Sequence, residues 1–333
     1  MAVETTPGVL RRGVSVVIPC YRSEASIGPL LEQLRPVLAS SAPAFEIILV
    51  DDASPDRTGA VIRELAGHHP DVIAIHLMRN YGQHAALLCG IRRAQFDITI
   101  TMDDDLQHPP DQLPRLLAAL TDEIDVVYGP AEREPHGLFR GIASRITKWV
   151  LQGAMGSTAG KVSALRVFRT RVREGFEAFR GSFVSLDVLL TWSTNRFSYL
   201  AVRHDARTIG ASSYTVRKLM THAVTMLTGF STIPLQIASI IGFALTGFGL
   251  AILGYVLVRY AIEGGSAPGF PFLASIISIF SGAQLLCVGI IGAYLGRAHF
   301  RLLDRPTYVV REASGSARGA DAGDVRTIAA PHG

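Results

Sequence analysis

Two long stretches of this chain contain no charged residue, and they limit what the chain can fold into. Residues 233–258 and 270–296 each exceed the roughly 20 residues that a helix needs to cross about 30 Å of hydrocarbon. A buried core helix of this length would normally carry a polar face, whereas the residues that interrupt these apolar runs are small or uncharged. Two transmembrane helices are therefore predicted, and two buried core helices are the less favoured alternative.

The short, glycine-rich connection at 259–269 predicts an antiparallel hairpin of these two helices. Basic residues gather before the first helix and after the second, while the connection has only Arg259, which Glu263 offsets. Because cytoplasmic loops carry an excess of Lys and Arg, both outer ends are expected in the cytoplasm. Glycine and serine residues in both stretches would let helices approach closely, which would also allow a homo-oligomer to form through them.

The composition of the chain indicates which classes of partner it can bind. The formal net charge is +4, and many of the positive charges flank the uncharged stretches, so a membrane surface is the expected partner. No nucleic acid is expected, since no recognised binding motif accompanies these charges. The three cysteines lie far apart without metal-ligand spacing, which is typical of a reduced cytoplasmic protein. The first residues, MAVETTPGVLRRG, lack the apolar core of a signal peptide.

Strand and helix patterns alternate through the first part of the chain. Apolar, β-branched runs predict strands at 14–19, 45–50, 72–78, 97–102 and 125–129, with helical patterns at 26–38, 55–66 and 82–94. This alternation predicts an α/β fold with a Rossmann-like, mostly parallel sheet covered on both faces. Ligands of such sheets bind outside the carboxyl ends of the strands. Polar clusters occur at those ends, at residues 19–21, 51–52, 79–80 and 103–107.

The strand at 97–102 is followed directly by three consecutive carboxylates. In extended geometry Asp103 and Asp105 point to one side of the chain and Asp104 to the other. Oxygen donors of this kind suit Mg²⁺ or Mn²⁺, which complete their shells with water and substrate phosphates. The alternative is a solvated acidic turn before a helix that begins near Pro109. A dinucleotide-binding fold is disfavoured, because PCYRSEASIG after the first strand is not a glycine-rich turn.

Five segments, in this order, resemble the inverting GT-A glycosyltransferases of family 2: VSVVIPCYRSEASI, ILVDDASPDRT, MRNYGQHAALLCGIRRA, TMDDDLQHPPDQLP and VVYGPAERE. Further segments resemble one branch of that family, the polyprenyl-phosphate glycosyltransferases: IASRIT, LRVFRTR, RTIGASSYTVRKL, GFSTIPLQ and GIIGAYLGR. That branch includes dolichyl-phosphate mannose synthase and the enzymes that charge undecaprenyl phosphate with glucose or aminoarabinose. The resemblance covers about residues 14–311.

Together with the composition, the resemblance divides the chain into four parts. A cytosolic GT-A domain is expected over residues 1–210, followed by an amphipathic juxtamembrane segment over 211–231. A two-helix transmembrane hairpin would occupy 232–297, and a cytosolic tail would occupy 298–333, disordered from about residue 312.

The resemblance also implies roles for individual residues. The nucleotide would be bound by Pro19, Tyr21, Glu24, Asp51, Asp52 and Arg79, with Asp103 near the ribose or sugar. The divalent metal on the donor diphosphate would be held by Asp105 and Gln107. Phosphates of the acceptor or donor would meet Arg133, Arg140 and Arg145, and a loop closing over the site would contain Arg207 and Ser212. The family often has a small residue where this chain has Asp104.

The implied reaction transfers a sugar from a UDP- or GDP-linked donor to polyprenyl (undecaprenyl or decaprenyl) phosphate, with inversion. No catalytic base is needed, because a lipid monophosphate with a second pKa near ~6 is already largely ionised at neutral pH. Such a phosphate can attack the sugar directly, without the proton removal that a hydroxyl acceptor demands. The alternative from another class is a catalytically silent membrane anchor, or a helper of a flippase for lipid-linked sugars. The acidic cluster argues against that alternative.

Overall fold

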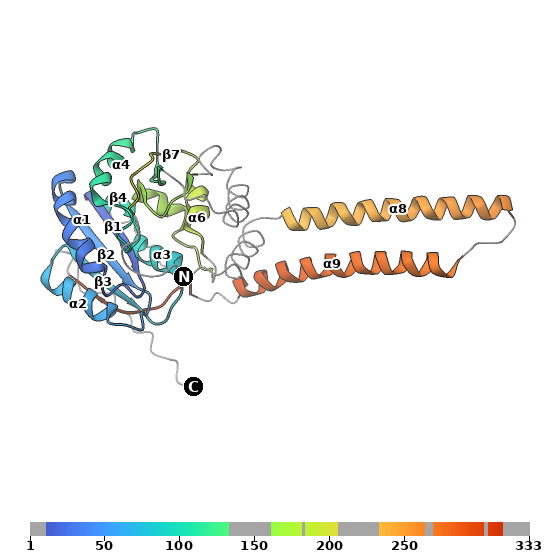
Figure 1. The fold of residues 1–333 in the computed structure, drawn as a ribbon, viewed down its shortest axis with the longest axis horizontal. Helices are drawn as coiled ribbons and strands as arrows, with labels where there is room; N and C mark the ends of the chain where they lie inside the picture. The colour runs from blue at the N-terminus through green and yellow to red at the C-terminus, as the bar shows by residue number, and fades with distance from the viewer. Residues whose placement is uncertain are drawn as a thin grey trace, which may run out of the picture.

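The computed structural model describes residues 11–132, 161–181, 184–205, 233–263, 269–302 and 306–315. These residues form an α/β unit around one eight-stranded sheet, and two long helices project together from one side of it (Figure 1). The strand order is β7-β5-β6-β4-β1-β2-β3-β8. The predicted α/β architecture is confirmed.

Four parallel strands form the centre of the sheet: β1 (Arg11–Cys20), β2 (Phe45–Asp51), β3 (Val72–Leu77) and β4 (Phe96–Thr101). Each lies on a predicted strand. The central strand β1 is buried from residue 13 to its end, with neighbours on both sides. Burial on both faces explains why these strands are nearly continuous apolar runs and do not alternate with polar residues.

Helices cover both faces of this sheet. Val16 of β1 faces α1 (Ile27–Ser41), α2 (Thr58–His68) and α4 (Leu113–Ala119), whereas Val17 faces α3 (Gln83–Arg93) and α6 (Leu186–Ser193). A Cβ on Gly90 of α3 would lie 2.3 Å from Cγ1 of Val17, so α3 can approach the sheet this closely only with glycine there. The three predicted helices are confirmed as α1, α2 and α3. Ser26 precedes α1 as expected but makes no side-chain capping bond.

Beyond β4 the sheet contains strands that the sequence pattern predicts only in part. The predicted fifth strand is confirmed as β5 (Val126–Tyr128), and β7 (Phe197–Tyr199) pairs with it in parallel. Strand β6 (Arg166–Arg169), which was not predicted, lies antiparallel between β4 and β5. Two 3₁₀ helices, η1 (Pro110–Gln112) and η3 (Thr170–Phe176), follow β4 and β6.

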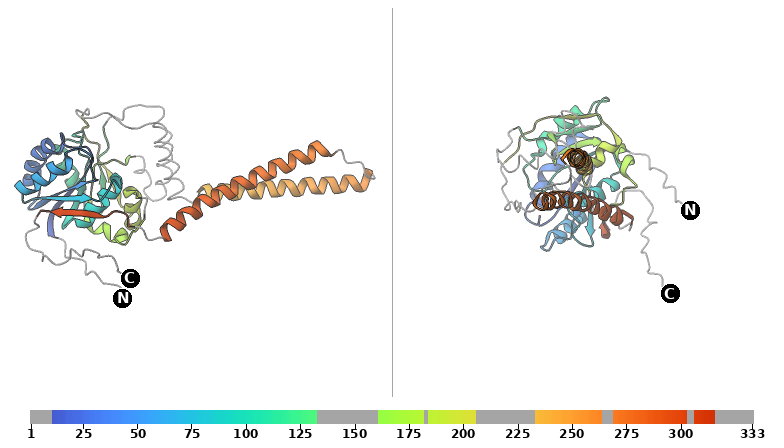
Figure 2. Two further views of the ribbon diagram at one scale, coloured as in Figure 1. Left: turned by 90° about the horizontal axis from the view of Figure 1, so that it is seen from below. Right: turned by 90° about the vertical axis from the view of Figure 1, so that its right-hand side faces the viewer.

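The C-terminal tail differs from the prediction. Residues 310–314 form β8 (Val310–Ser314), which pairs antiparallel with β3 and appears in red at the edge of the sheet in Figure 2. The prediction of disorder from about residue 312 is therefore wrong for residues 312–314. The physical reason is that β3 has a free edge, whose backbone groups the tail pairs with. Residues 316–333 lie outside the described part of the chain.

The two long helices, α8 (Ile233–Glu263) and α9 (Phe270–Leu302), lie side by side and antiparallel (Figure 2). A Cβ on Gly249 would lie 2.8 Å from Cζ of Phe280, so the small residue permits close contact. The helices predicted at 233–258 and 270–296 are present. Within the described parts of the chain, no helix combines the length and the apolar character that crossing a membrane requires. The predicted juxtamembrane segment, residues 211–231, lies outside the described residues.

Candidate active site

The carboxyl ends of the parallel strands lie together along one edge of the sheet, here called the carboxyl edge. Cys20 at the end of β1 pairs with Asp51 at the end of β2, and Asp51 pairs with His76 of β3. On the other side of β1, β4 ends at Thr101, two residues before Asp103. The predicted convergence of the polar clusters on this edge is confirmed.

Backbone strain marks the same edge. Arg22, Ala53 and Leu106 have φ angles of 60°, 53° and 60°, and they are the non-glycine residues with positive φ among the residues described. They follow the ends of β1, β2 and β4. Left-handed conformations of such residues cost about 1–3 kcal/mol each and gather at functional sites. The strain is therefore a sign of function that is independent of the residue types.

The acidic run leaves β4 in a tight turn, and its members bind to different parts of the edge. Asp103 accepts a hydrogen bond from Nε2 of Gln83, the first residue of α3, at 2.6 Å. Asp104 turns back toward β1 and accepts a hydrogen bond from the Ser23 hydroxyl. Burial raises the pKa of Asp104, and the bond from Ser23 opposes this rise. Asp104, the carboxylate that departs from the family pattern, is therefore bonded to the loop that follows β1.

The two aspartates at the end of β2 are buried and already hydrogen-bonded. Asp52 accepts bonds from the backbone N–H groups of Tyr81 and Gly82, at 2.7 and 2.8 Å, and so holds the start of α3. Burial nevertheless raises the pKa of Asp52. Asp51 accepts a bond from the Ser54 N–H at 2.9 Å and lies 3.2 Å from His76 Nδ1. Burial opposes ionisation of Asp51, but these hydrogen bonds outweigh it and lower its pKa.

The other residues that were predicted to bind the nucleotide differ in their exposure to solvent. Tyr21 and Arg79 are exposed at the carboxyl edge, and the Arg79 guanidinium lies 4.7 Å from the centre of the Tyr81 ring. Pro19 is buried within β1, and Glu24 accepts a bond from the Arg57 N–H just before α2. The structure therefore places Tyr21, Arg79 and the exposed Glu24 where a ligand could touch them, while Pro19 is buried.

A pair of histidines that the sequence reasoning did not single out lies beside Gln107. The backbone N–H of Asp205 donates to the Gln107 carbonyl at 2.9 Å, which brings residues 204–205 next to the acidic turn. His204 and His108 meet edge to face with 4.7 Å between ring centres. Burial lowers the pKa of His108 to about 4, so His108 is neutral at neutral pH. Its position next to Gln107 in the sequence was the one available signal.

A buried ion pair behind the acidic turn was also missed. Arg166 of β6 donates from Nε and Nη2 to Asp187 of α6, at 2.8 and 3.1 Å, and the Tyr128 hydroxyl donates to the same carboxylate. Nη1 of Arg166 also donates to the Thr101 hydroxyl at 3.3 Å. Burial disfavours ionised Asp187, but the charge of Arg166 outweighs burial and lowers the Asp187 pKa. The pair therefore fixes the end of β4, just before Asp103.

Comparison with known proteins places this chain in a family. A model of glycosyl transferase family 2 matches residues 15–169. The chain is 33% identical over 309 residues to an undecaprenyl-phosphate 4-deoxy-4-formamido-L-arabinose transferase of Yersinia enterocolitica, covering 91% of this chain and 94% of that protein. It is 34% identical over 306 residues to the transferase of the same name from Proteus mirabilis, with the same coverage. This chain belongs to glycosyl transferase family 2.

The resemblance stated from the sequence is thereby confirmed, and the chain is a glycosyltransferase with a GT-A-like α/β fold. Among solved structures, glucosyl-3-phosphoglycerate synthase from Mycobacterium tuberculosis, in complex with Mn²⁺ and uridine-diphosphate-glucose, is 17% identical with a TM-score of 0.45. That match covers 65% of this chain and 77% of the other.

The acidic turn of this glycosyltransferase offers donors that fit a hard divalent cation. Asp103, Asp105 and Gln107 supply carboxylate and amide oxygens within one short segment. Among the described residues, no three His, Cys, Asp or Glu side chains surround a common point as a ready-made metal site. Mg²⁺ commonly binds through one or two carboxylates plus substrate phosphates and water, so a complete protein cage is not required. The donor set therefore fits an ion that arrives with a diphosphate.

Several predicted residues cannot be placed. Arg133, Arg140, Arg145, Arg207 and Ser212 lie outside the described residues, so their roles stay predictions.

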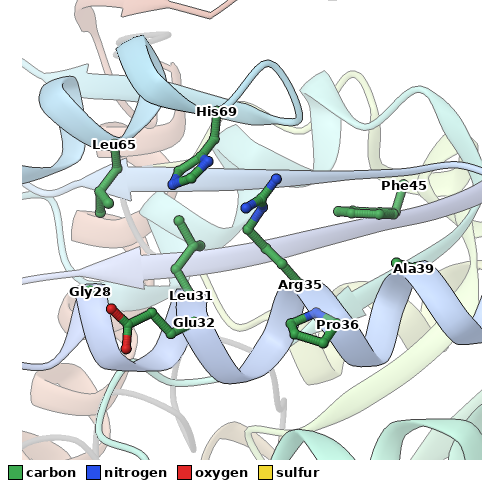
Figure 3. A pocket seen from close by; sticks show the side chains of 9 residues that line it. All are labelled: Gly28, Leu31, Glu32, Arg35, Pro36, Ala39, Phe45, Leu65 and His69. Carbon is green, nitrogen blue, oxygen red and sulfur yellow. The ribbon is translucent and has the colours of Figure 1, made fainter.

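An open groove in the glycosyltransferase lies away from the carboxyl edge. It runs along α1, between that helix and the end of α2, and reaches Phe45 at the amino end of β2 (Figure 3). Arg35 in its wall makes two hydrogen bonds to Asp71, at 2.8 and 2.9 Å. The groove contains none of the predicted site residues.

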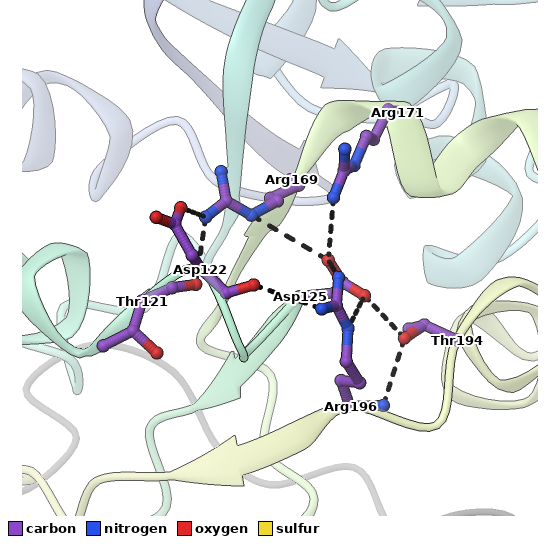
Figure 4. Close-up of polar contacts among 7 residues, drawn as sticks. All are labelled: Thr121, Asp122, Asp125, Arg169, Arg171, Thr194 and Arg196. Atoms are coloured by element: carbon purple, nitrogen blue, oxygen red, sulfur yellow. Dashed lines mark hydrogen bonds and ion pairs between the residues drawn. The ribbon is translucent and has the colours of Figure 1, made fainter.

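A second cluster of charges lies at the opposite, amino ends of β5 and β7, here called the amino edge. Arg196 donates two hydrogen bonds to Asp125, at 2.8 and 2.9 Å, and Thr194 donates a third at 2.7 Å (Figure 4). Arg171 and Arg169 lie 3.4 and 3.8 Å from the same carboxylate. Burial opposes ionisation of Asp125, but the bonds from Arg196 and Thr194 outweigh it and lower its pKa.

Proposed function

We propose that this glycosyltransferase transfers a sugar from a nucleotide sugar to a polyprenyl phosphate, with inversion at the anomeric carbon. The observation that carries the proposal is the identity to undecaprenyl-phosphate 4-deoxy-4-formamido-L-arabinose transferases. It extends over 91% of this chain and 94% of the Yersinia enterocolitica protein, so most of both chains is included. The shared part is therefore larger than the family-2 segment alone, which ends at residue 169.

The proposal assigns no catalytic base, because the acceptor is already an anion. A lipid phosphate with a second pKa near ~6 is an anionic nucleophile at neutral pH. The protein has to bring this anion close to the donor diphosphate, another anion, and guanidinium groups are well suited to holding phosphates. Arg133, Arg140, Arg145 and Arg207 are proposed for that role. Attack opposite the leaving diphosphate inverts the sugar carbon.

On the donor side, we assign the carboxyl edge to the nucleotide sugar. Tyr21 and Arg79 would contact the nucleotide, and Asp52 and Asp51 would shape its pocket through their bonds to the start of α3 and to Ser54. Asp105 and Gln107, with Asp103 beside them, would hold Mg²⁺ or Mn²⁺. The bound cation would neutralise charge on the leaving diphosphate. A UDP- or GDP-linked donor is proposed, and the relatives' name makes 4-deoxy-4-formamido-L-arabinose the first sugar to test.

We further propose that α8 and α9 form a hairpin in a bacterial inner membrane, with the α/β unit and the C-terminus in the cytoplasm. Large apolar side chains are exposed along both helices, which suits contact with lipid: Ile240, Phe243, Phe248, Leu250, Leu273, Leu285, Val288 and Leu295. Residues 233–258 and 270–296 contain no charge. A polyprenyl acceptor stays in the bilayer, so an enzyme attached to the membrane meets its headgroup at the surface. Contact between copies through these helices would give a homo-oligomer.

The alternative, a catalytically silent anchor or flippase helper, is not favoured, because the relatives are named transferases. The experiment that tests the proposal supplies purified protein with a panel of nucleotide sugars and undecaprenyl phosphate, and follows sugar into the lipid extract. Undecaprenol without the phosphate is the control acceptor. Transfer to the phosphate, with an inverted anomeric configuration by NMR, is expected. Equal transfer to undecaprenol, or none to either, would contradict the proposal.

A further inference from the structure

We propose that residues 306–315, here called the C-terminal strap, hold the α/β unit in position over the membrane surface, so that its site meets the acceptor phosphate. Thr307, Tyr308 and Arg92 are the positioning residues of this device. The proposal rests on the proposed function, since it concerns how a membrane-bound acceptor is reached. Its evidence is the way in which the strap connects the end of α9 to the carboxyl edge.

The strap is bound along its length to the α/β unit. Strand β8 pairs with β3, from Ala74 opposite Ser314 to Leu77 opposite Val310. The Met78 N–H donates to the Val309 carbonyl at 2.9 Å, which continues the pairing beyond the strand. An ion pair of 3.2 Å joins Glu312 of the strap to α2. The strap is therefore a part of the sheet.

Before β8, the strap contacts the segment that leads into α6. The hydroxyl of the buried Thr307 accepts a hydrogen bond from the Gly181 N–H at 3.2 Å. Arg92, in the last turn of α3, donates to the Tyr308 hydroxyl at 3.4 Å and to the carbonyls of Glu177 and Phe179, at 2.7 and 2.6 Å. Arg92 thus ties together the strap, α3 and residues 177–181.

Helix α3 connects these contacts of the strap to the candidate active site. The first residue of α3, Gln83, donates to Asp103, and Asp52 accepts from the backbone just before that helix. The last turn of α3 carries Arg92, which holds the strap. One short, packed helix therefore lies between the acidic turn and the attachment of α9. A displacement of the strap would move the site relative to α9.

The two links between the α/β unit and the long helices differ in length. Only residues 303–305 separate Leu302 of α9 from Pro306, so their Cα atoms are at most about 14 Å apart. Residues 206–232 separate the α/β unit from α8, a length of chain that could span up to about 95 Å. The short link at α9, and not the long one at α8, limits where the site can lie.

The consequence concerns the acceptor. A lipid phosphate held at the bilayer surface meets the site at an effective concentration that depends on the length of the link. A slack link would lower that concentration, and displacement of a reacting group by about 1 Å can cost on the order of a hundredfold in rate. A water-soluble acceptor would diffuse to the site wherever it lies.

The test inserts a short flexible Gly-Ser segment between Arg305 and Pro306, which leaves the strap's own contacts in place. Transfer is measured to undecaprenyl phosphate in vesicles and to a short-chain, water-soluble polyprenyl phosphate. We expect kcat/KM for undecaprenyl phosphate to fall by about tenfold or more, with the short-chain value and the Tm unchanged. The matched control has the same insertion after Gly265, between α8 and α9, and should behave as the unmodified protein.

A second variant, Thr307→Val with Tyr308→Phe, removes two polar contacts of the strap and keeps the strand. Its kcat/KM for undecaprenyl phosphate should fall less than that of the insertion variant, while the short-chain value again stays unchanged. Unchanged transfer to undecaprenyl phosphate in the insertion variant would overturn the proposal, and so would equal losses with both acceptors at unchanged Tm. Failure of the unmodified protein with both acceptors would instead refute the proposed function.

Discussion

The two edges of the sheet differ in the partners that surround their aspartates. At the amino edge, Asp125 lies among three arginines, and its pKa is lowered. At the carboxyl edge, Asp52 and Asp104 are bound by neutral N–H and O–H donors, and burial raises their pKa values. An ion pair satisfied within the chain stabilises the fold. Carboxylates whose pKa values are raised by burial are typical of functional sites.

The largest expected effect tests the carboxyl edge directly. Asp105→Asn should lower transfer to polyprenyl phosphate by about a thousandfold, because losing a charge that holds the cation on the diphosphate costs several kcal/mol in the transition state. Chelation with EDTA should abolish transfer, and added Mg²⁺ or Mn²⁺ should restore it. Asp122→Asn, at the exposed amino edge, is the matched control and should leave the rate unchanged. Near-normal turnover by folded Asp105→Asn protein would remove the metal assignment.

Variants of Arg166 test whether this buried cation near the acidic turn stabilises the fold. Arg166→Met alone should destabilise the protein by about 3–5 kcal/mol, because Asp187 is left buried and charged without its partner. Arg166→Met with Asp187→Leu should recover most of that loss, since apolar replacement of a buried pair is often neutral. Urea unfolding in detergent measures both. If the double variant is as unstable as Arg166→Met, then the unpaired charge of Asp187 is not the cause of the loss.

At the amino edge, Asp125→Asn should destabilise the protein by about 2 kcal/mol, because charge-assisted bonds are lost and the arginines repel. Folded protein should keep its transfer rate. The pKa of Asp125 is lowered in the folded state. Its contribution is therefore complete above the unfolded value of about 3.9 and is lost as the pH falls through the lower, folded value. The difference in unfolding free energy between the two proteins should shrink in that acidic range, measured by urea unfolding.

Replacing Asp104 should change stability in the opposite direction from Asp125→Asn, and this is the smallest effect expected. Its pKa is raised in the folded state, so its charge destabilises the fold above that raised value, and the penalty vanishes as the pH falls to the unfolded value of about 3.9. Without divalent cation, Asp104→Asn should match or exceed the unmodified protein in stability near neutral pH, by up to about 1 kcal/mol. The advantage should disappear on acidification. A loss of stability as large as that of Asp125→Asn would erase the contrast between the two edges.

The sequence alone was enough for the core of the fold and for the convergence of polar clusters at the carboxyl edge. Strands buried on both faces must be continuous apolar runs, so β1 to β4 could be located from residues such as those of β1. Parallel strands place their carboxyl ends on one edge, so Asp51, Asp52 and Asp103 had to converge there. Long uncharged stretches likewise predicted α8 and α9.

Other features depended on tertiary structure, because each joins segments that lie far apart in the chain. Strand β6 carries Arg166, and nothing in its local pattern shows that it enters between β4 and β5 to meet Asp187. Strand β8 comes from a tail whose composition suggests disorder, and it is ordered by the free edge of β3. Residue type alone could not show that Asp52 would hold α3 while Asp125 would be enclosed by arginines. Sequence patterns report burial and period along the chain, whereas the partner of a charge is decided by which distant segment folds against it.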